Sequence, residues 1–279
     1  MASTAPAQFR EEVVRWQQKL LEIQQSYREK IERQLPVFAV ERAEGNYILE
    51  SENFPFSPVL FREILLYLAP LLTDCCSRSL DCVPLLSRLD DEVLDQLATA
   101  VQSSPEQDFA DALSLAVDEV RLERRTELPR DILELLLQAA FVPFYSAFAR
   151  QQDISGQKDA GWCPVCGQLP VNGCNMAEDN SRVLGCWLCN TSWTYSRLAC
   201  PACQNQDHEK LRVFTVEEQP RHRLQVCSEC NHYIKITHDW PQQSYCAMSE
   251  NATTAYLDIL AQQQGYRPAS RALCRKPIN

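Results

Sequence analysis

The chain has 279 residues, of which 45% are hydrophobic and seven are glycine, and its formal net charge is −10. This composition indicates a globular chain of about two domains rather than a disordered one, with a sizeable buried core. The charge is uneven, since residues 1–149 hold 14 Lys and Arg against 25 Asp and Glu. Because general nucleic-acid binding depends on neutralising phosphates, we expect no nucleic-acid partner.

The N-terminal sequence MASTAPAQFREEVVRW has neither the basic and apolar regions of a secretory signal nor a twin-arginine pair. The most apolar stretch, residues 133–149, is short for a membrane span and is interrupted by Glu134, Gln138 and Pro143. We therefore expect a buried core helix there, no membrane span, and a cytoplasmic protein. In a reducing cytosol, the 14 cysteines indicate metal ligands or redox pairs rather than disulfides.

The first 150 residues are predicted to form a bundle of about five or six helices. Their apolar residues recur at helical spacing among strong helix formers. Pro129 lies where a first-turn proline belongs, and Pro143 is expected to kink the last helix. The predicted helices cover residues 9–34, 59–72, 110–122 and 132–149, with a further helix that includes residues 89–97 and ends before Ser103.

The composition changes after residue 149, and the remaining chain is predicted to be richer in strands. Short β-prone runs lie at residues 192–198, 211–216 and 232–237, Gln219-Pro220 is expected to be a turn, and residues 250–264 predict a helix. The predicted fold class is therefore α+β. We expect a helical domain over 1–150, a polar linker over 151–161, metal-binding modules over 162–198 and 199–245, and a C-terminal helix and tail over 246–279.

Four Cys-x-x-Cys pairs lie between residues 163 and 230. Four thiolates bind a metal ion at tetrahedral corners about 2.3 Å from it, and two such pairs across a hairpin can supply them. The first two pairs are separated by 19 residues, which fits a zinc ribbon, and the last two by 23, which is slightly long. The pattern predicts two tetrathiolate sites, formed by Cys163, Cys166, Cys186 and Cys189, and by Cys200, Cys203, Cys227 and Cys230.

The residue after each pair supports this interpretation. A metal-binding knuckle tends to need a residue that tolerates a positive φ, so that backbone amides can turn toward the sulfurs. Gly and Asn reach that conformation at least cost. Gly167, Asn190 and Asn231 fit the requirement, whereas Gln204 is an exception with Asn205 beside it.

Other arrangements of the same cysteines are less consistent with the sequence. Core cysteines without a ligand do not explain four pairs of equal spacing, and thioredoxin-type exchange expects one pair near a βαβ unit. Crossed ligation, of the first pair with the third and the second with the fourth, stays open. Four thiolates suit either zinc or iron, so the residues alone do not select the metal. A closed site leaves no position for a catalytic water, and no hydrolase or phosphate-loop motif is present, so we do not expect an enzyme.

The remaining cysteines and the aromatic residues have simpler interpretations. Cys174 lies in the first ribbon loop and is expected to be an exposed thiol, and the four histidines are not expected to be ligands. The aromatic residues near the pairs are expected to supply a core for two small ribbons, or alternatively a partner surface that includes Trp193, Arg197 and Arg223. Cys75, Cys76 and Cys82 are expected to be buried small hydrophobic residues or bystanders, and Cys246 and Cys274 have no partner pattern.

The cysteine region resembles the FdhE family of formate dehydrogenase accessory proteins. The resemblance lies in WCPVCGQLP from Trp162, RVLGCWLCNTSWTYSRLACPAC from Arg182, RLQVCSECNHYIKI from Arg223, and LDILAQQQGY, which ends at Tyr266. It implies a helical domain followed by two rubredoxin-like modules that bind iron through the eight paired cysteines. It also implies a cytoplasmic maturation factor that binds the catalytic subunit of a respiratory formate dehydrogenase before export and is required for its activity.

Two other functions remain as alternatives at this point. One is a rubredoxin-like electron-transfer protein, for which a helical domain of this size is more than is required. The other is a zinc-ribbon adaptor of the transcription machinery, which the acidic charge opposes. The sequence leaves the oligomeric state open.

Overall fold

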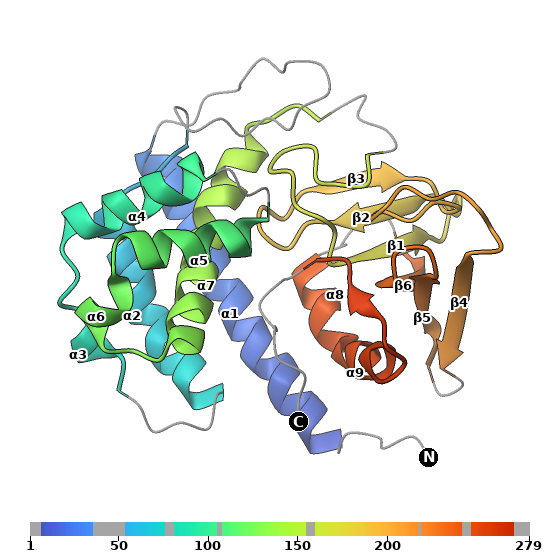
Figure 1. Cartoon of the computed structure of the whole chain (residues 1–279), viewed down its shortest axis with the longest axis horizontal. Coiled ribbons are helices and arrows are strands. Elements are labelled where there is room, and N and C mark those ends of the chain that lie inside the picture. The colour runs from blue at the N-terminus through green and yellow to red at the C-terminus, as the bar shows by residue number, and fades with distance from the viewer. Residues whose placement is uncertain are drawn as a thin grey trace. The chain divides into compact units, whose positions relative to one another are not determined.

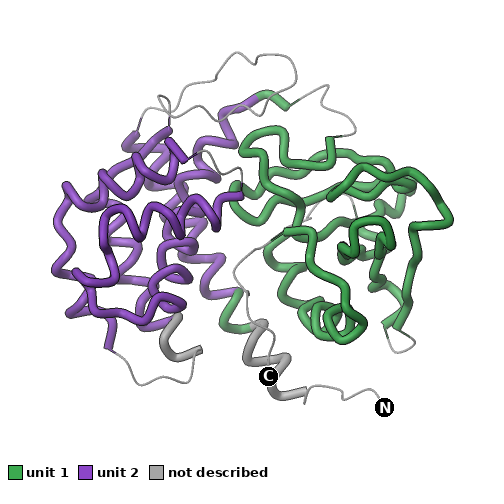
Figure 2. The backbone as a smooth tube through the Cα atoms, viewed as in Figure 1, with its two compact units in different colours: residues 1–17, 153–279 green, residues 18–152 purple. Residues whose placement is uncertain are grey.

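The computed structural model describes residues 7–35, 54–75, 81–104, 108–154, 160–216, 219–241 and 247–270. Helices come first along the chain, and strands with two short helices follow (Figure 1). The chain divides into two compact units, one of residues Gln18–Gln152 and one of residues Met1–Gln17 and Asp153–Asn279 (Figure 2). The side chain of Cys75, all of Cys76, Cys246 and Cys274, and residues 155–159 of the predicted linker lie outside the described residues.

The unit of residues 18–152 is helical, and the first helix of the chain begins before it, at Ala7. Two short helices, α3 and α6, were not expected, because four or five residues are too few to show a period. Asp90 and Asp108 cap the N-termini of α4 and α5 by accepting hydrogen bonds from the backbone amides of Val93 and Ala110. The helices are α1 (Ala7–Gln34), α2 (Pro58–Cys75), α3 (Val83–Leu86), α4 (Asp91–Ser103), α5 (Phe109–Glu119), α6 (Leu122–Thr126) and α7 (Arg130–Arg150).

Helix α7 is the apolar centre of this unit. It is long and apolar enough to cross a membrane, but 83% of its most apolar window is buried inside the protein, as in a core helix. Pro129 is its N-cap rather than a first-turn residue, and the helix continues through Pro143. Proline has no N–H to donate to the carbonyl of Ala139, and the buried side chain of Gln24 in α1 donates to that oxygen instead, at 2.9 Å.

The second unit is built on one mixed sheet. Its main path runs β3-β2-β1-β6-β5-β4, and the short β7 pairs with β6. Neighbours on that path are antiparallel except β1 and β6, whose parallel pairing joins the two cysteine modules into one sheet. The strands are β1 (Asn172–Met176), β2 (Arg182–Gly185), β3 (Ser192–Tyr195), β4 (Leu211–Val216), β5 (Gln219–Cys227), β6 (His232–Trp240) and β7 (Arg267–Pro268).

Two sequence predictions are wrong in this unit. Gln219 and Pro220 begin β5 instead of forming a turn, because Val216 already pairs with Gln219. The predicted C-terminal helix is divided at Thr254 into α8 (Ala247–Thr253) and α9 (Ala255–Gln263). The α+β class, with a helical part followed by two zinc-ribbon-like modules and C-terminal helices, is confirmed.

The two faces of the sheet differ in what covers them. Side chains alternate between faces along a strand, so residues with the same parity share a face. On one face, Leu224, Val226 and Tyr233 pack against Leu257 and Ala261 of α9. Polar side chains of the same face also reach the helices: Lys235 Nζ lies 2.7 Å from Asp258 Oδ2, and Asn172 donates to the carbonyl of Ala247 at 2.8 Å.

Candidate metal centres

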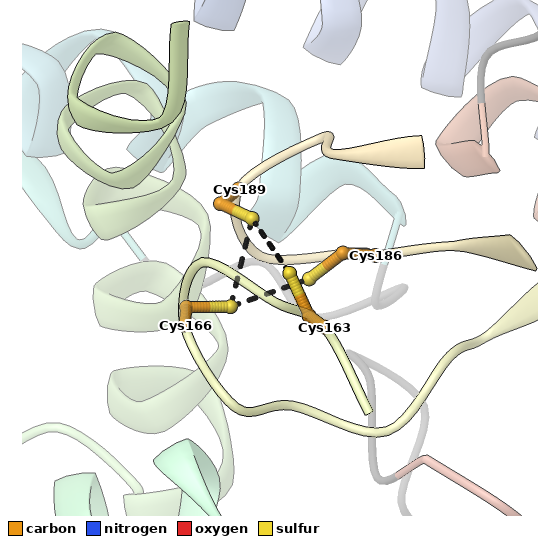
Figure 3. Close-up of side chains that lie close together, drawn as sticks. All are labelled: Cys163, Cys166, Cys186 and Cys189. Carbon is orange, nitrogen blue, oxygen red and sulfur yellow. Dashed lines mark hydrogen bonds between the residues drawn. The ribbon is translucent and has the colours of Figure 1, made fainter. Parts of the chain in front are cut away.

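The first two cysteine pairs meet at one point in the structure. We call Cys163, Cys166, Cys186 and Cys189 cluster 1 (Figure 3). Its Sγ atoms all lie within 4.8 Å of one another, and three separations are 3.4, 3.5 and 3.5 Å. The edge of a tetrahedron with metal–sulfur bonds of 2.3 Å is roughly 3.8 Å. The four sulfurs therefore fit a single metal ion with little movement.

The third and fourth pairs form a second group of the same kind. We call Cys200, Cys203, Cys227 and Cys230 cluster 2. The Cys200–Cys230 and Cys203–Cys227 sulfur separations are 3.7 and 3.8 Å. The pairs are thus grouped in sequential order along the chain, and neither cluster contains a cysteine from the other.

All four knuckles have the same backbone turn. The amide of the residue after each of three pairs donates to the carbonyl of the first cysteine of that pair, at 2.7–2.9 Å. The φ angles of Gly167, Asn190, Gln204 and Asn231 are +77°, +58°, +60° and +58°. Gln204 is therefore not an exception, since it takes the same conformation as the others at a greater steric cost.

The two clusters differ in their exposure to solvent. Every cysteine of cluster 1 is buried, with Val165, Trp187 and Leu188 at 0–1% exposure around them. In cluster 2, Cys203 is exposed and Cys230 is half-buried. Cluster 1 is consequently closed to solvent, whereas cluster 2 is open on one side.

The electrostatics of cluster 1 favour a cation. Burial, reinforced by the neighbouring thiols, raises the pKa of Cys166 and Cys186 well above the ordinary value. Burial opposes ionisation of Cys163 as well, but hydrogen bonds from Cys166, Cys186 and Cys189 lower its pKa. Four buried sulfurs at these distances can all be thiolates only with a positive charge among them.

Cluster 2 shows a milder form of the same pattern. Burial raises the pKa of Cys200 and raises that of Cys230 to about 11. Burial also acts against ionisation of Cys227, yet the backbone amides of Cys230 and Glu229 and the neighbouring thiols lower its pKa. Each of the two clusters could hold one metal ion with these donors.

Several other predicted residues are placed differently from expectation. Cys174 is fully buried in β1 rather than exposed in a loop. Trp193 is 4% exposed and its indole N–H donates to the carbonyl of Ala160 at 2.8 Å, so its ring is part of the core and is not offered to a partner. Arg197 and Arg223 instead line a common cavity of about 550 Å³ on the sheet.

That cavity was not found from the sequence. Its arginines and histidines are spread from residue 182 to residue 238, and they meet only because five strands and the loops between them place them together. The one signal available beforehand was the presence of Arg197 and Arg223 among the candidate partner contacts.

Comparisons with known proteins relate the chain to one family. No family model matches it. It is 31% identical over 145 residues to the FdhE homolog of Aquifex aeolicus, across 50% of this chain and 51% of that protein. It is also 30% identical over 112 residues to the protein FdhE of Escherichia coli O157:H7, across 39% of this chain and 36% of that protein. The matches thus span about half or less of the length of these relatives.

A solved structure extends the likeness to the whole fold. The crystal structure of the FdhE protein from Pseudomonas aeruginosa matches with a TM-score of 0.55 and 19% identity, over 95% of both chains. At this identity the match concerns the fold alone. Together with the two curated relatives, it confirms the resemblance to FdhE proteins that the cysteine pairs indicate.

Proposed function

From this relationship to the FdhE proteins, we propose that the chain is a formate dehydrogenase accessory protein that acts in maturation rather than in catalysis. It binds the catalytic subunit of a respiratory formate dehydrogenase in the cytoplasm and is required for the activity of that enzyme. The observation that carries the proposal is the pair of four-cysteine clusters on an FdhE-like fold. The relation to curated FdhE proteins at about 30% identity supports it.

We further propose that each cluster binds one metal ion through its four thiolates. The modules would then cover residues 162–198 and 199–245, between a helical domain over 1–150 with its linker and the C-terminal helices. The resemblance favours iron, and the sulfur geometry fits zinc equally well. A bound iron would supply one-electron chemistry, whereas zinc would contribute only to folding.

The first test is the metal content and visible spectrum of the full chain purified without oxygen. Two irons per chain, with a thiolate-to-iron absorption that bleaches on reduction, would support a redox role during maturation. Two colourless zinc ions would make both clusters structural and leave the proposed function in protein binding. Fewer than one metal per chain after anaerobic purification would contradict ligation by both clusters.

The second test is capture of the formate dehydrogenase catalytic subunit by the tagged chain in cells that make both. The double variant C200S/C203S removes half of the cluster 2 ligands, and C174S is the matched control outside both clusters. We expect the control to capture the subunit and support formate dehydrogenase activity like the wild type. Full formate dehydrogenase activity in cells that lack this chain would contradict the proposal.

A second candidate function is favoured by the exposure of cluster 2. An exposed Cys203 beside a metal ion would give a soluble redox partner a short path for an electron, as in a rubredoxin-like carrier. Reversible one-electron reduction of an iron-loaded chain, with no retention of the catalytic subunit, would favour this function over maturation.

A further inference from the structure

The face of the sheet that α8 and α9 do not cover holds an arginine-rich cavity of about 550 Å³. Arg182 and Asn175 on β2 and β1, Arg223 on β5 and His238 on β6 all line it. Register explains why they share a face, since Asn175 pairs with Arg182 and Arg223 pairs with Ile236, another lining residue. Its full lining is Asn175, Arg182, Ser196, Arg197, Leu198, His208, Leu211, Val213, Arg223, Gln225, Ile236 and His238.

The cavity is lined by arginines without an acidic lining residue, and Asp239, whose charge raises the pKa of His238, is the next residue along β6. No Asp or Glu is among its described lining residues, and within the described part of the chain Arg182, Arg197 and Arg223 form no ion pair. This is unusual in a chain whose net charge is −10. Three guanidinium groups without ion-pair partners among the described residues, around one cavity, create a positive potential that attracts anions.

Two of the arginines differ in how their donors are satisfied: the guanidinium of Arg182 is held by hydrogen bonds, whereas Arg223 Nε is not. Arg182 is 6% exposed and is held by neutral acceptors alone: Asn175 Oδ1, the carbonyl of Arg197, and Gln225 Oε1. Gln225 is itself fixed by donating to the carbonyl of Ala199. Arg223 Nε is buried and has no hydrogen-bond partner among the described residues. A buried unsatisfied donor is costly, and a ligand with an acceptor oxygen in the cavity would satisfy it.

The titration of the nearby groups agrees with this positive field. Burial, followed by the charge of Arg197, lowers the pKa of Arg182 to about 10. Burial and then the charges of Arg223, Arg182 and Arg197 lower the pKa of His238 to about 4. An anion placed among these side chains would oppose the part of each shift that comes from the arginine charges.

We propose that this cavity binds a small organic molecule that carries a phosphate group. Guanidinium groups bind phosphate oxygens through paired, charge-assisted hydrogen bonds, and several arginines suit one phosphate. The volume is that of a small-molecule site, and Leu198, Leu211, Val213 and Ile236 provide apolar walls for the part that bears the phosphate. This inference does not depend on the proposed function, because it is argued from the cavity residues alone. Neither the cysteine clusters nor the similarity to FdhE proteins is part of the argument.

The burial of Arg182 favours a small ligand over a protein surface as the occupant. Arg182 is 6% exposed, so a flat partner surface would contact the exposed Arg197 but not Arg182. Arg197 and Arg223, predicted from the sequence as partner contacts, therefore become ligand contacts in this proposal.

The test is isothermal titration calorimetry of the zinc-loaded full chain with phenyl phosphate and with inorganic phosphate, at fixed ionic strength in chloride. Phenyl phosphate is expected to bind more tightly than phosphate, because its ring reaches the apolar walls. R223Q and R197Q are each expected to weaken binding by roughly tenfold or more, the effect of losing one charge-assisted contact. Metal content is measured alongside, so that extraction of zinc is not read as binding.

The matched control is R212Q, which removes an exposed arginine from β4. Residue 212 alternates with the lining residues Leu211 and Val213, so it lies on the other face, and its replacement should leave the affinity unchanged. If R223Q does not fold, R197Q still tests the proposal. The side chain of Arg197 is exposed and lies outside the strands, so its replacement leaves the sheet intact. In the wild type, the ring proton resonances of His238 should shift on addition of phenyl phosphate.

Three results would overturn the proposal. The first is the lack of saturable binding of either phosphate at millimolar concentration. The second is equal loss of affinity in R212Q and R223Q, which would show a general charge effect. The third is tight binding of an acidic peptide that phenyl phosphate does not displace, which would assign the cavity to a protein partner.

Discussion

Clusters 1 and 2 have the same backbone turn and different surroundings. In both, two Cys-x-x-Cys knuckles with positive φ bring four sulfurs within 4.8 Å. Cluster 1 is enclosed by Trp187 and Leu188, whereas Gln204, Ser228 and Glu229 beside cluster 2 are exposed. The knuckle therefore sets the sulfur geometry, and the packing around it sets how easily solvent, oxidants and chelators reach the metal site.

The largest expected difference is in folding. Metal binding by four cysteines contributes on the order of 10 kcal/mol to the folding of small metal modules. We expect C163S/C166S to prevent accumulation of folded chain, because it leaves two hydroxyls and two thiols buried without a cation. C200S/C203S should fold and retain about half the metal, since the open side of cluster 2 lets water solvate the remaining groups.

Metal analysis and thermal unfolding followed by circular dichroism check this difference. The matched control is C174S, which alters a buried cysteine of the same sheet without touching either cluster. Equal unfolding temperatures for the two double variants would show that burial does not distinguish the clusters.

The two clusters should lose their metal ions to a chelator at different rates. A chelator in excess is expected to remove one metal quickly and the second slowly, because only cluster 2 exposes a ligand, Cys203, before the chain unfolds locally. Stopped-flow absorbance with a colorimetric chelator measures both phases. The C200S/C203S variant should show the slow phase alone, and a single phase in the wild type would contradict the assignment.

Thiol labelling provides a third comparison, with Cys174 as an internal reference. Burial and then the charge of Glu250 raise the pKa of Cys174 to about 12, so at pH 8 its thiolate fraction is roughly one in ten thousand. In the chain from which only the cluster 2 metal has been removed, iodoacetamide at pH 8 should modify Cys203 before the other cysteines of the described residues and leave Cys174 unmodified. Mass spectrometry of peptides after timed quenching measures the order, and early labelling of Cys174 would show that β1 opens.

Features of the fold that depend on residues close together in the sequence could be predicted, and features that depend on distant segments could not. The knuckles are local, so the spacing of the pairs and the residues after them predicted four metal-binding turns, while crossed ligation stayed open until the structure grouped the pairs in sequential order. The main helices also follow from local periodicity, as α1 and α7 show. The parallel pairing of β1 with β6 could not be predicted, because it joins segments about 60 residues apart and NGCNM has no alternation of apolar residues.

The same limit explains the errors at single residues. Cys174 was expected in a loop, since nothing in its neighbourhood shows that β1 becomes an inner strand of the sheet. Trp193 was a candidate contact because tryptophan is frequent at interfaces. Its ring is instead buried in the small core of this unit. The arginine-rich cavity depends on registers between five strands, which a single sequence does not encode in any local pattern.

The smallest expected difference concerns Gln204, the one knuckle residue poorly suited to its backbone. A non-Gly residue in the left-handed region costs roughly 1–2 kcal/mol, and Asn bears this cost more easily than Gln. The side chain of Gln204 is exposed, so Q204N loses no packing. We expect Q204N to raise the unfolding free energy by up to about 1 kcal/mol, which corresponds to about 2–4 °C in Tm.

The reverse exchange in the same cluster completes the comparison. Asn231 has nearly the same φ and is also exposed, so N231Q should lower the Tm by a similar amount. Both variants are measured with metal bound, because the turn matters only when the amides face the sulfurs. If both substitutions shift the Tm in the same direction, the left-handed conformation is not what distinguishes these positions, and the cost assigned to Gln204 lies elsewhere in the knuckle.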